Sequence, residues 1–275
     1  MAVIAISRQV AALGDEIAAA AARKLGYKFI DRKQIEEKIV QLGFPKEKLS
    51  KYDEKKPGFF ASLVKDRDEY LNYLQCAVLE AASEGNCILI GRGAFIILEN
   101  LPNLLSFRFI AKDSVRMERL KTEFSWNDKQ AQARITESDS NRRGFHKSFF
   151  NLEHEDPQHF ILTMNTGILT VPEAAGIIEN LVKTCITSEK EAEGKKMVAN
   201  LLKCQRLVNQ LLFEYKVGIN FLHAVSDSSG SFITLQGVAD SQAAVDRTVQ
   251  LAAKILPSCS IKSAITVVQD FKNYQ

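Results

Sequence analysis

The residues SRQVAALGDEIA, Ser7 to Ala18, connect an apolar run to an alanine-rich one. The run before them, Val3 to Ile6, is short and rich in β-branched residues, which predicts a buried strand. The alanines predict a helix with Asp15 and Glu16 in its first turn, where carboxylates suit the helix dipole. In a parallel-sheet protein such a turn is where phosphate binds, because the loop amides and the helix N-terminus point at the anion.

Strands and helices alternate along the first 185 or so residues. Apolar runs predict further strands at 87–90, 107–111 (with Arg108 set aside) and 159–164. Helical spacing, caps and stops predict helices at 31–42, 59–84, 115–124, 127–150 and 172–187, with Asp31 and Gln34 as a capping box and Asp113 as an N-cap. The alternation implies right-handed crossovers and a parallel sheet flanked by helices, an α/β fold.

The sequence changes character after the segment SEKEAEGKK, residues 188–196. This stretch is almost purely polar and is our linker candidate, with a boundary near residue 192. Beyond it, helical spacing at 197–215 and 239–256 and strand patterns at 216–225, 231–238 and 261–268 predict a small α-β-β-α-β domain. We therefore predict two domains, residues 1–190 and 196–275.

Composition excludes several classes of protein. Of the 275 residues, 46% are hydrophobic and 25% charged, with a net charge of +3, which is typical of a globular protein and demands no polyanion partner. We therefore expect no nucleic-acid partner. The five cysteines form no C-x-x-C pair and the four histidines no convincing ligand set, so we predict no metal site. No segment reaches roughly 18 consecutive apolar residues, and we expect a cytoplasmic protein without a transmembrane segment.

Five stretches, in order, resemble the cytidylate kinase-like family. Ser7 to Ala18 is similar to that family's opening S-R-E-Y-G-S-G-G-R-E-I-A, and Phe29 to Lys33 resembles its Y-D-K element. The sequence ILIGRGA, Ile88 to Ala94, resembles V-I-V-G-R-C-A. In the fourth stretch, Asp139, Arg142 and Phe145 fall where the family has D-x-x-R-x-x-Y. The fifth stretch joins Asp156-Pro157, similar to the family's D-P, and Leu162 to Thr166, similar to its L-V-L-N-T near the last strand.

The resemblance implies a P-loop kinase-type fold for residues 3–185 and a nucleotide ligand, CMP-like on the acceptor side, with ATP and magnesium as cofactors if the protein is active. It places the Gly91-Arg92-Gly93 turn at a strand's carboxyl end, where Arg92 would engage the acceptor phosphate. The implied catalytic residues are Arg92, Arg116 and Arg142. The implied cofactor-binding residues are Ser7, Arg8, Gly14, Asp15, Arg119 and Arg143, and the implied substrate-binding residues are Asp31, Gly91, Arg92 and Gly93.

The phosphate loop departs from the family pattern. A full P-loop reads G-x-x-x-x-G-K-[ST], in which glycines let the backbone wrap closely and lysine reaches the outer phosphates. At the family's glycine positions this chain has Ala11 and Leu13 and keeps only Gly14, and Asp15 stands where the family has a basic residue. A carboxylate about 5 Å from a phosphate oxygen costs on the order of 3 kcal/mol at an effective dielectric near 20. Leu13 adds bulk, and a β-carbon disfavours positive φ.

Three hypotheses for function stay open. The first is a nucleotide-binding or regulatory protein on a kinase scaffold with weak or lost phosphotransfer, a pseudoenzyme. The second is an active nucleoside-monophosphate kinase of the cytidylate type. The third is a protein-interaction scaffold that binds no nucleotide.

The C-terminal domain resembles a second family. Phe232 to Val238, FITLQGV, followed by Asp240 and an Ala/Val-rich helix, is similar to the hairpin strand V-T-L-x-G-x-V and helix of the BON domain family. The resemblance implies a binding module with a lipid or protein partner and no catalytic group. A K-homology RNA-binding domain has related topology, but its G-x-x-G loop is absent. Homo-oligomerisation is left open.

Overall fold

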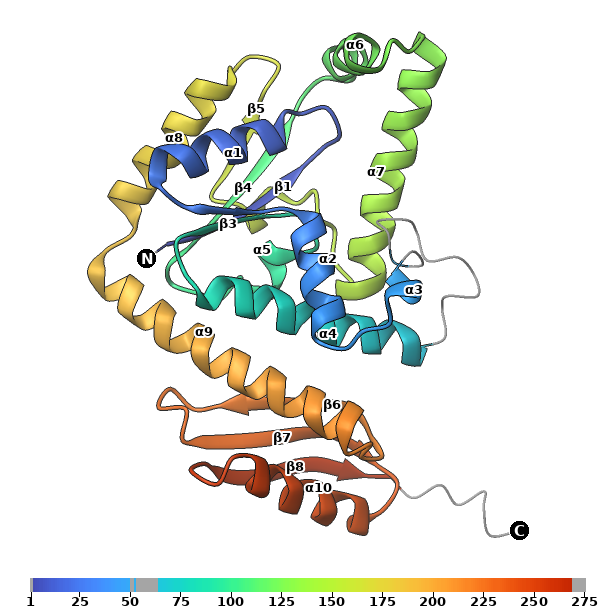
Figure 1. Ribbon diagram of the computed structural model, residues 1–275, viewed down its shortest axis with the longest axis vertical. Coiled ribbons are helices and arrows are strands. Elements are labelled where there is room, and N and C mark those ends of the chain that lie inside the picture. Colours follow the sequence, from blue (N-terminus) through green and yellow to red (C-terminus); the bar gives the residue numbers. More distant parts are fainter. Residues whose placement is uncertain (1, 50–51, 53–63, 269–275) are drawn as a thin grey trace. The chain divides into compact units, whose positions relative to one another are not determined.

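The protein is described by a computed structural model that covers residues 2–49, 52 and 64–268. The chain divides into two compact units, residues 1–195 and 196–275, here called unit 1 and unit 2. Figure 1 shows an α/β arrangement in unit 1 and a small sheet with helices in unit 2.

Unit 1 contains a five-stranded sheet in which neighbouring strands are parallel. The strands are β1 (Val3–Arg8), β2 (Lys28–Ile30), β3 (Cys87–Ile90), β4 (Leu104–Ile110) and β5 (Leu162–Asn165), in the spatial order β2-β3-β1-β4-β5. Ile6 of β1 pairs with Ile90 of β3 and with Phe107 of β4, so the carboxyl ends of these strands share one edge. Open α/β sheets bind their ligands at this edge. The predicted fold class is confirmed.

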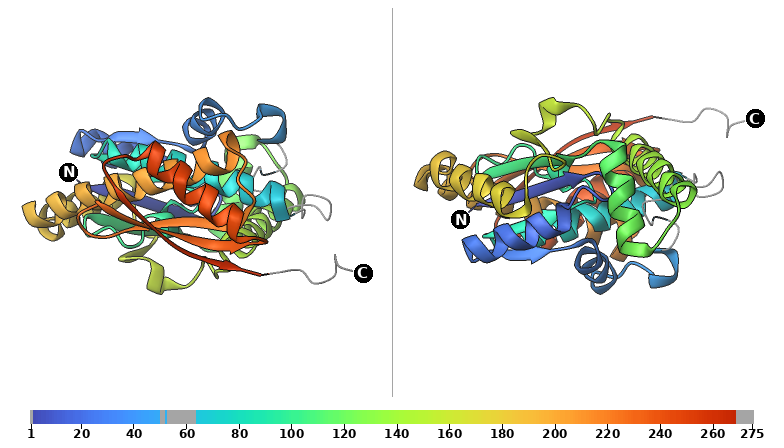
Figure 2. Two further views of the ribbon diagram at one scale, coloured as in Figure 1. Left: turned by 90° about the horizontal axis from the view of Figure 1, so that it is seen from below. Right: turned by 90° about the horizontal axis from the view of Figure 1, so that it is seen from above.

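Helices cover both faces of this sheet (Figure 1). On one face α1 (Gly14–Leu25) packs against α8 (Val171–Cys185), and their alanines join β1, β3 and β4 in one buried core. On the other face lie α4 (Val64–Ser83) and α5 (Ala94–Ile97). The further helices of unit 1 are α2 (Arg32–Gln41), α3 (Lys46–Leu49), α6 (Asp113–Phe124), α7 (Asp128–Phe150) and a 3-10 turn, Pro157–His159. In the right view of Figure 2, α6 and α7 (green) lie side by side.

Helix ends in unit 1 carry strong local signals, and the predicted capping box at Asp31 is confirmed. Asp31 and Gln34 form a capping box at the start of α2, and Asn127 forms one with its N3 residue at the start of α7. Gly26 ends α1 in the left-handed conformation, and Pro172 lies in the first turn of α8. These local signals work because they satisfy backbone groups that the helix itself leaves without partners.

The predicted linker, residues 188–196, is helical, and the chain divides into its two units between residues 195 and 196. This segment forms the first turns of α9 (Ser188–Asn209). The hydroxyl of Thr187 accepts a hydrogen bond from the amide of Lys190, and Glu189 lies in the first turn. Capping and the helix dipole therefore stabilise a helix here although the composition is polar.

Other differences are small. Asp113 is the first residue of α6 rather than its N-cap, and its carboxylate accepts a hydrogen bond from Arg116. The strand expected at 159–164 is β5, which starts later, after the 3-10 turn. The elements β2, α3 and α5 have three or four residues each, too few to show a period in sequence. Residues 59–63 of the predicted long helix lie outside the described residues, and α4 confirms the remainder.

Unit 2 has the predicted α-β-β-α-β order. After α9 and a π-helical turn (Gln210–Glu214), β6 (Ile219–Ser226) and β7 (Phe232–Ala239) form an antiparallel hairpin, and α10 (Gln242–Ile255) leads to β8 (Ser260–Val267), parallel to β7. The left view of Figure 2 shows α10 against this sheet. In the described part of the chain, no helix combines the length and hydropathy needed to cross a bilayer.

Candidate functional site

The loop between β1 and α1 contains two left-handed residues that are not glycine. Ala11 has φ 58° and Leu13, the N-cap of α1, has φ 54°. This conformation costs a residue with a β-carbon roughly 1–2 kcal/mol. Leu13 adopts it nonetheless, because its side chain packs on the buried core of the sheet and the burial offsets the strain.

The side chain of Arg8 lies over the start of α1. A β-carbon at Gly14 would lie 2.6 Å from Cγ of Arg8, so only glycine allows this close approach. Nε of Arg8 donates to Oδ2 of Asp15 at 3.5 Å. The guanidinium group of Arg8 therefore faces the carboxylate of Asp15, the residue that stands where the family has a basic one.

Two arginines of α6 hold the carbonyl groups of the same loop. Nε of Arg116 donates to the Val10 carbonyl at 3.0 Å, and its Nη1 and Nη2 bind the Asp139 carboxylate at 2.9 and 2.8 Å. Nη1 of Arg119 donates to the Ala11 carbonyl at 2.9 Å. Burial lowers the pKa of Arg119 from its ordinary value. These guanidinium groups thus fix the loop to α6.

The turn after β3 is also left-handed throughout. Gly91, Arg92 and Gly93 have φ values of 80°, 54° and 70°. The Arg92 side chain is 2% exposed; its Nη1 donates to the Tyr52 carbonyl at 2.7 Å, and its Nη2 binds the Glu36 carboxylate. Arg92, the arginine that the family resemblance assigns to the acceptor phosphate, is therefore held by the carboxylate of Glu36.

The loop and the turn meet α7 around a small cavity. Its volume is about 10 Å³, and it is lined by Arg8, Gly91, Arg92, Arg142, Phe145 and His146. This is close to the least volume that holds one water molecule. The cavity gathers three arginines but leaves no room for a nucleoside.

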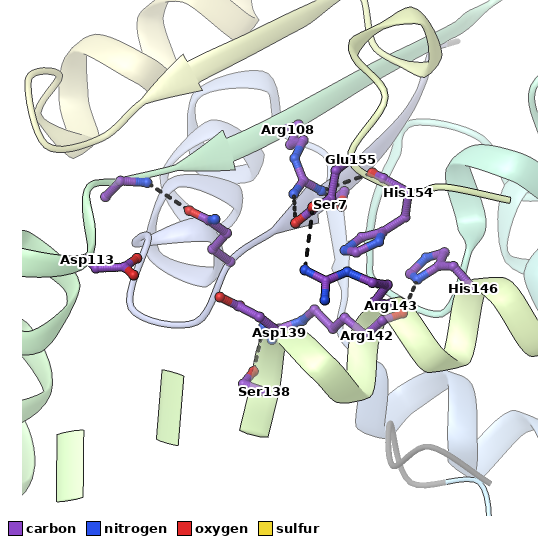
Figure 3. A network of polar contacts seen from close by, with 12 residues as sticks. Ser7, Arg108, Asp113, Ser138, Asp139, Arg142, Arg143, His146, His154 and Glu155 are labelled. Carbon is purple, nitrogen blue, oxygen red and sulfur yellow. Dashed lines mark hydrogen bonds and ion pairs between the residues drawn. The ribbon is translucent and has the colours of Figure 1, made fainter. Parts of the chain in front are cut away.

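Beside this cavity lies a cluster of charged side chains (Figure 3). Arg108 of β4 donates through Nη1 to the Ser7 hydroxyl at 3.2 Å and to the His154 carbonyl at 3.0 Å, and its Nη2 lies 3.4 Å from Glu155. Glu155 also pairs with the exposed Arg143 at 3.8 Å. Burial lowers the pKa of Arg108 from its usual value.

Two buried histidines stack within this cluster (Figure 3). The rings of His146 and His154 are 4.6 Å apart and inclined by 11°. Nδ1 of His146 donates to the Arg142 carbonyl at 2.8 Å, whereas Nδ1 of His154 is buried with no hydrogen-bond partner among the described residues. Burial first, and then His146 and the nearby arginines, lower the pKa of His154 to about 3, so its ring is neutral at pH 7.

Residues 3–168 match the model of the cytidylate kinase-like family. The chain belongs to this family. The match covers β1 through the turn after β5 and therefore includes the loop, the cavity and the charged cluster. A comparison with curated proteins returned no match.

Comparison with solved structures finds proteins that are similar to this cytidylate kinase-like chain. An uncharacterised protein from Eubacterium ventriosum is similar with a TM-score of 0.51 and 16% identity, over 67% of this chain and 99% of that one. Shikimate kinase from Bacteroides thetaiotaomicron has a TM-score of 0.41 and 17% identity, over 66% and 98%. YorR protein from Bacillus subtilis, in complex with phosphorylated GDP, has a TM-score of 0.38 and 15% identity, over 66% and 95%.

The structure brings together only part of the predicted site of this cytidylate kinase-like chain. Four predicted residues line the cavity: Arg8, Gly91, Arg92 and Arg142. Other predicted residues make contacts within the protein: Ser7 accepts from Arg108, Asp31 caps α2, Gly93 is the N-cap of α5, and Arg116 and Arg119 hold the loop.

Sequence reasoning missed Arg108, Glu36, His146 and His154. Arg108 had a signal, because a charged residue inside an apolar strand needs a partner when it is buried.

The loop does not fit the magnesium triphosphate that the family implies. Asp15 stands where the family has a basic residue, and the carboxylate of Asp15 is engaged by Arg8. Within residues 2–49, 52 and 64–268, no three histidine, cysteine or carboxylate side chains converge as a metal site.

Proposed function

We propose that this member of the cytidylate kinase-like family binds a nucleotide, has weak or lost phosphotransfer, and acts through binding or regulation. The observation that carries the proposal is that carboxylates of the chain itself pair with the arginines that face the site. Arg8 pairs with Asp15, and Arg92 is buried against the Glu36 carboxylate and the Tyr52 carbonyl. Between them the cavity is only about 10 Å³.

The loop contributes to the same conclusion. Phosphoryl transfer depends on positioning and on neutralising the charge of the phosphates. A carboxylate about 5 Å from a phosphate oxygen costs on the order of 3 kcal/mol, which removes most of the affinity for a triphosphate. Pairing with Arg8 reduces this repulsion but also engages the cation that would attract the phosphates.

A coupled ADP-release assay tests this proposal. ATP and magnesium are supplied with a panel of nucleoside monophosphates, CMP and dCMP included, and the wild type is compared with Arg92→Ala. We expect no turnover above that of the variant, together with a thermal shift of the wild type by nucleotides. Saturable turnover that disappears in Arg92→Ala would overturn the proposal, and no thermal shift with any nucleotide would favour the scaffold hypothesis.

An active nucleoside-monophosphate kinase is the second candidate. It is favoured by one observation, the convergence of Arg8, Arg92 and Arg142 on a single cavity at the carboxyl edge of the sheet. Guanidinium groups suit phosphate oxygens. This function requires Phe145 and α7 to move away from the cavity before an acceptor enters, and the same assay decides between the two candidates.

For unit 2 we propose a BON-like binding module with a lipid or protein partner. Its support is the α-β-β-α-β order together with the hairpin strand Phe232 to Val238 that carries the resemblance. Co-sedimentation of the full chain with anionic and with neutral vesicles tests the lipid partner. Absence of binding to both vesicle types would leave a protein partner.

A further inference from the structure

An exposed aromatic pair lies at the turn between α6 and α7. Phe124, the last residue of α6, is 49% exposed, and its ring stacks on that of Trp126 with centroids 4.7 Å apart and planes inclined by 25°. Ser125 between them has φ 55°, and this left-handed residue turns the chain so that the two rings face each other. Trp126 also packs against Leu120 and Ile135, whereas much of Phe124 stays exposed.

The pair is held at a fixed position relative to the phosphate loop. Val10 and Ala11 of the loop pack on the same small cluster as Trp126. Arg119 bonds the Ala11 carbonyl, and Phe124 follows five residues later on the same helix, about 7.5 Å further along its axis. The aromatic pair therefore lies at the end of the helix that holds the loop, and Trp126 shares a hydrophobic cluster with two loop residues.

The charges beside the pair do not suit phosphate. The ammonium of Lys121 is engaged by the carboxylates of Glu118 at 2.9 Å and of Asp128 at 2.8 Å. Lys121 precedes Phe124 by three residues, and Asp128 follows Trp126 by two. A flat, uncharged aromatic ring suits this surface better than an anion does, because it gains stacking area without needing a cation.

We propose that the outer face of the exposed Phe124 ring, backed by Trp126, is a platform on which the base of a bound nucleotide stacks, so that a nucleotide on the loop side is held by its base more than by its phosphates. The inference rests on the proposed nucleotide binding and says how the ligand is recognised. Asp15 opposes each added phosphate, while stacking is indifferent to phosphate number. Purines bind more tightly than pyrimidines, because the larger ring covers more apolar surface.

Trp126 is the single tryptophan of the chain and reports directly on the platform. The full chain is titrated with AMP, ADP, ATP and CMP, and separately with inorganic tripolyphosphate, while tryptophan fluorescence is recorded. We expect all three adenine nucleotides to quench the fluorescence, with ADP and ATP binding no more tightly than AMP because Asp15 opposes the added phosphates. CMP should bind more weakly, and tripolyphosphate should leave the signal unchanged.

Calorimetry of variants completes the test. Phe124→Leu keeps an apolar side chain but removes the ring, and should weaken AMP binding about tenfold. Phe124→Tyr keeps an aromatic ring and should bind AMP as tightly as the wild type does. Phe221→Leu is the matched control, because Phe221 is also exposed, at 69%, but lies in unit 2. AMP binding that survives Phe124→Leu unchanged, or tripolyphosphate that binds as tightly as ATP, would overturn the platform alone. Absence of any nucleotide binding to the wild type would overturn both the platform and the proposed function.

Discussion

The β1–α1 loop and the β3–α5 turn both lead from the carboxyl end of a strand to a helix, at neighbouring places on one sheet edge. The β3–α5 turn keeps glycines on both sides of Arg92, whereas the β1–α1 loop adopts left-handed φ at Ala11 and Leu13. The comparison teaches that left-handed bends at this sheet edge are built in two ways. The turn uses glycines beside Arg92, whereas the loop holds residues with a β-carbon in the same conformation at a cost in strain.

The largest expected effect is on the β3–α5 turn. A β-carbon at Gly93, where φ is 70°, would lie 2.5 Å from the Phe150 ring. Gly93→Ala should therefore lower the free energy of unfolding by about 3 kcal/mol, through left-handed strain and overpacking together. Urea denaturation measures this loss.

Gly176→Ala in α8 is the matched control for Gly93→Ala. A β-carbon at Gly176 meets nothing within 4 Å, and alanine is the better helix former. We expect Gly176→Ala to be neutral or stabilising. Equal losses in the two variants would show that the turn has no special need for glycine.

The second prediction concerns acid. Because the pKa of His154 is lowered to about 3 in the fold, the unfolded chain binds more protons than the native one between pH 6.5 and 3. The contribution of His154 to the free energy of unfolding is present above pH 6.5 and decreases as the pH falls. At pH 5 the protein has lost about 2 kcal/mol of this stability. The charged groups that face the ring are Arg108, Arg142, Arg143 and His146.

His154→Phe keeps a ring against His146 but removes the titrating group. The difference in unfolding free energy between pH 6.5 and pH 5 should shrink by about 1.6 kcal/mol in this variant. Parallel curves for the variant and the wild type would mean that His154 is protonated inside the fold.

The third prediction tests the internal carboxylate at the acceptor side. In Glu36→Gln the partner of Arg92 loses its charge, so an external anion competes more easily for the guanidinium. CMP affinity should rise about tenfold, the equivalent of about 1.4 kcal/mol, by calorimetry. Asp31→Asn is the control, because Asp31 caps the same helix without binding Arg92. An equal rise in CMP affinity in both variants would mean that the gain comes from a change in α2 as a whole and not from the charge of Glu36.

The smallest effect is expected in the loop. Ala11→Gly removes a β-carbon from a residue at φ 58° and should stabilise unit 1 by about 1 kcal/mol. Thermal denaturation with and without ATP separates stability from ligand binding. We expect no gain in ATP affinity, because the substitution leaves Asp15 in place. A gain would mean that loop strain rather than charge limits binding.

The order of elements in unit 1 could be predicted from sequence because the signals are local. The capping box at Asp31, the stop at Gly26 and the apolar run of β3 each act within a few residues. The helix at 188–209 was missed in its first turns because composition was given more weight than the cap at Thr187. Short elements such as β2 show no period and depend on neighbours brought by the fold.

The candidate site could be predicted only in part. Motifs pointed to Arg92 and Arg142, which line one cavity. The pairing of Arg92 with Glu36 joins residues 56 positions apart, and that of Arg108 with Ser7 joins residues 101 apart. No local pattern encodes such contacts, yet they decide whether an arginine faces a ligand or holds the framework.

The most direct test of the central claim is calorimetric titration of ATP and magnesium into the wild type and into the double variant Leu13→Gly, Asp15→Lys. If the loop has lost its grip on the triphosphate through charge and bulk, the wild type binds ATP no more tightly than AMP, and the variant gains at least about tenfold for ATP alone. Unchanged or weaker ATP binding in the variant would contradict this account, because the loop would then not be where the phosphates bind.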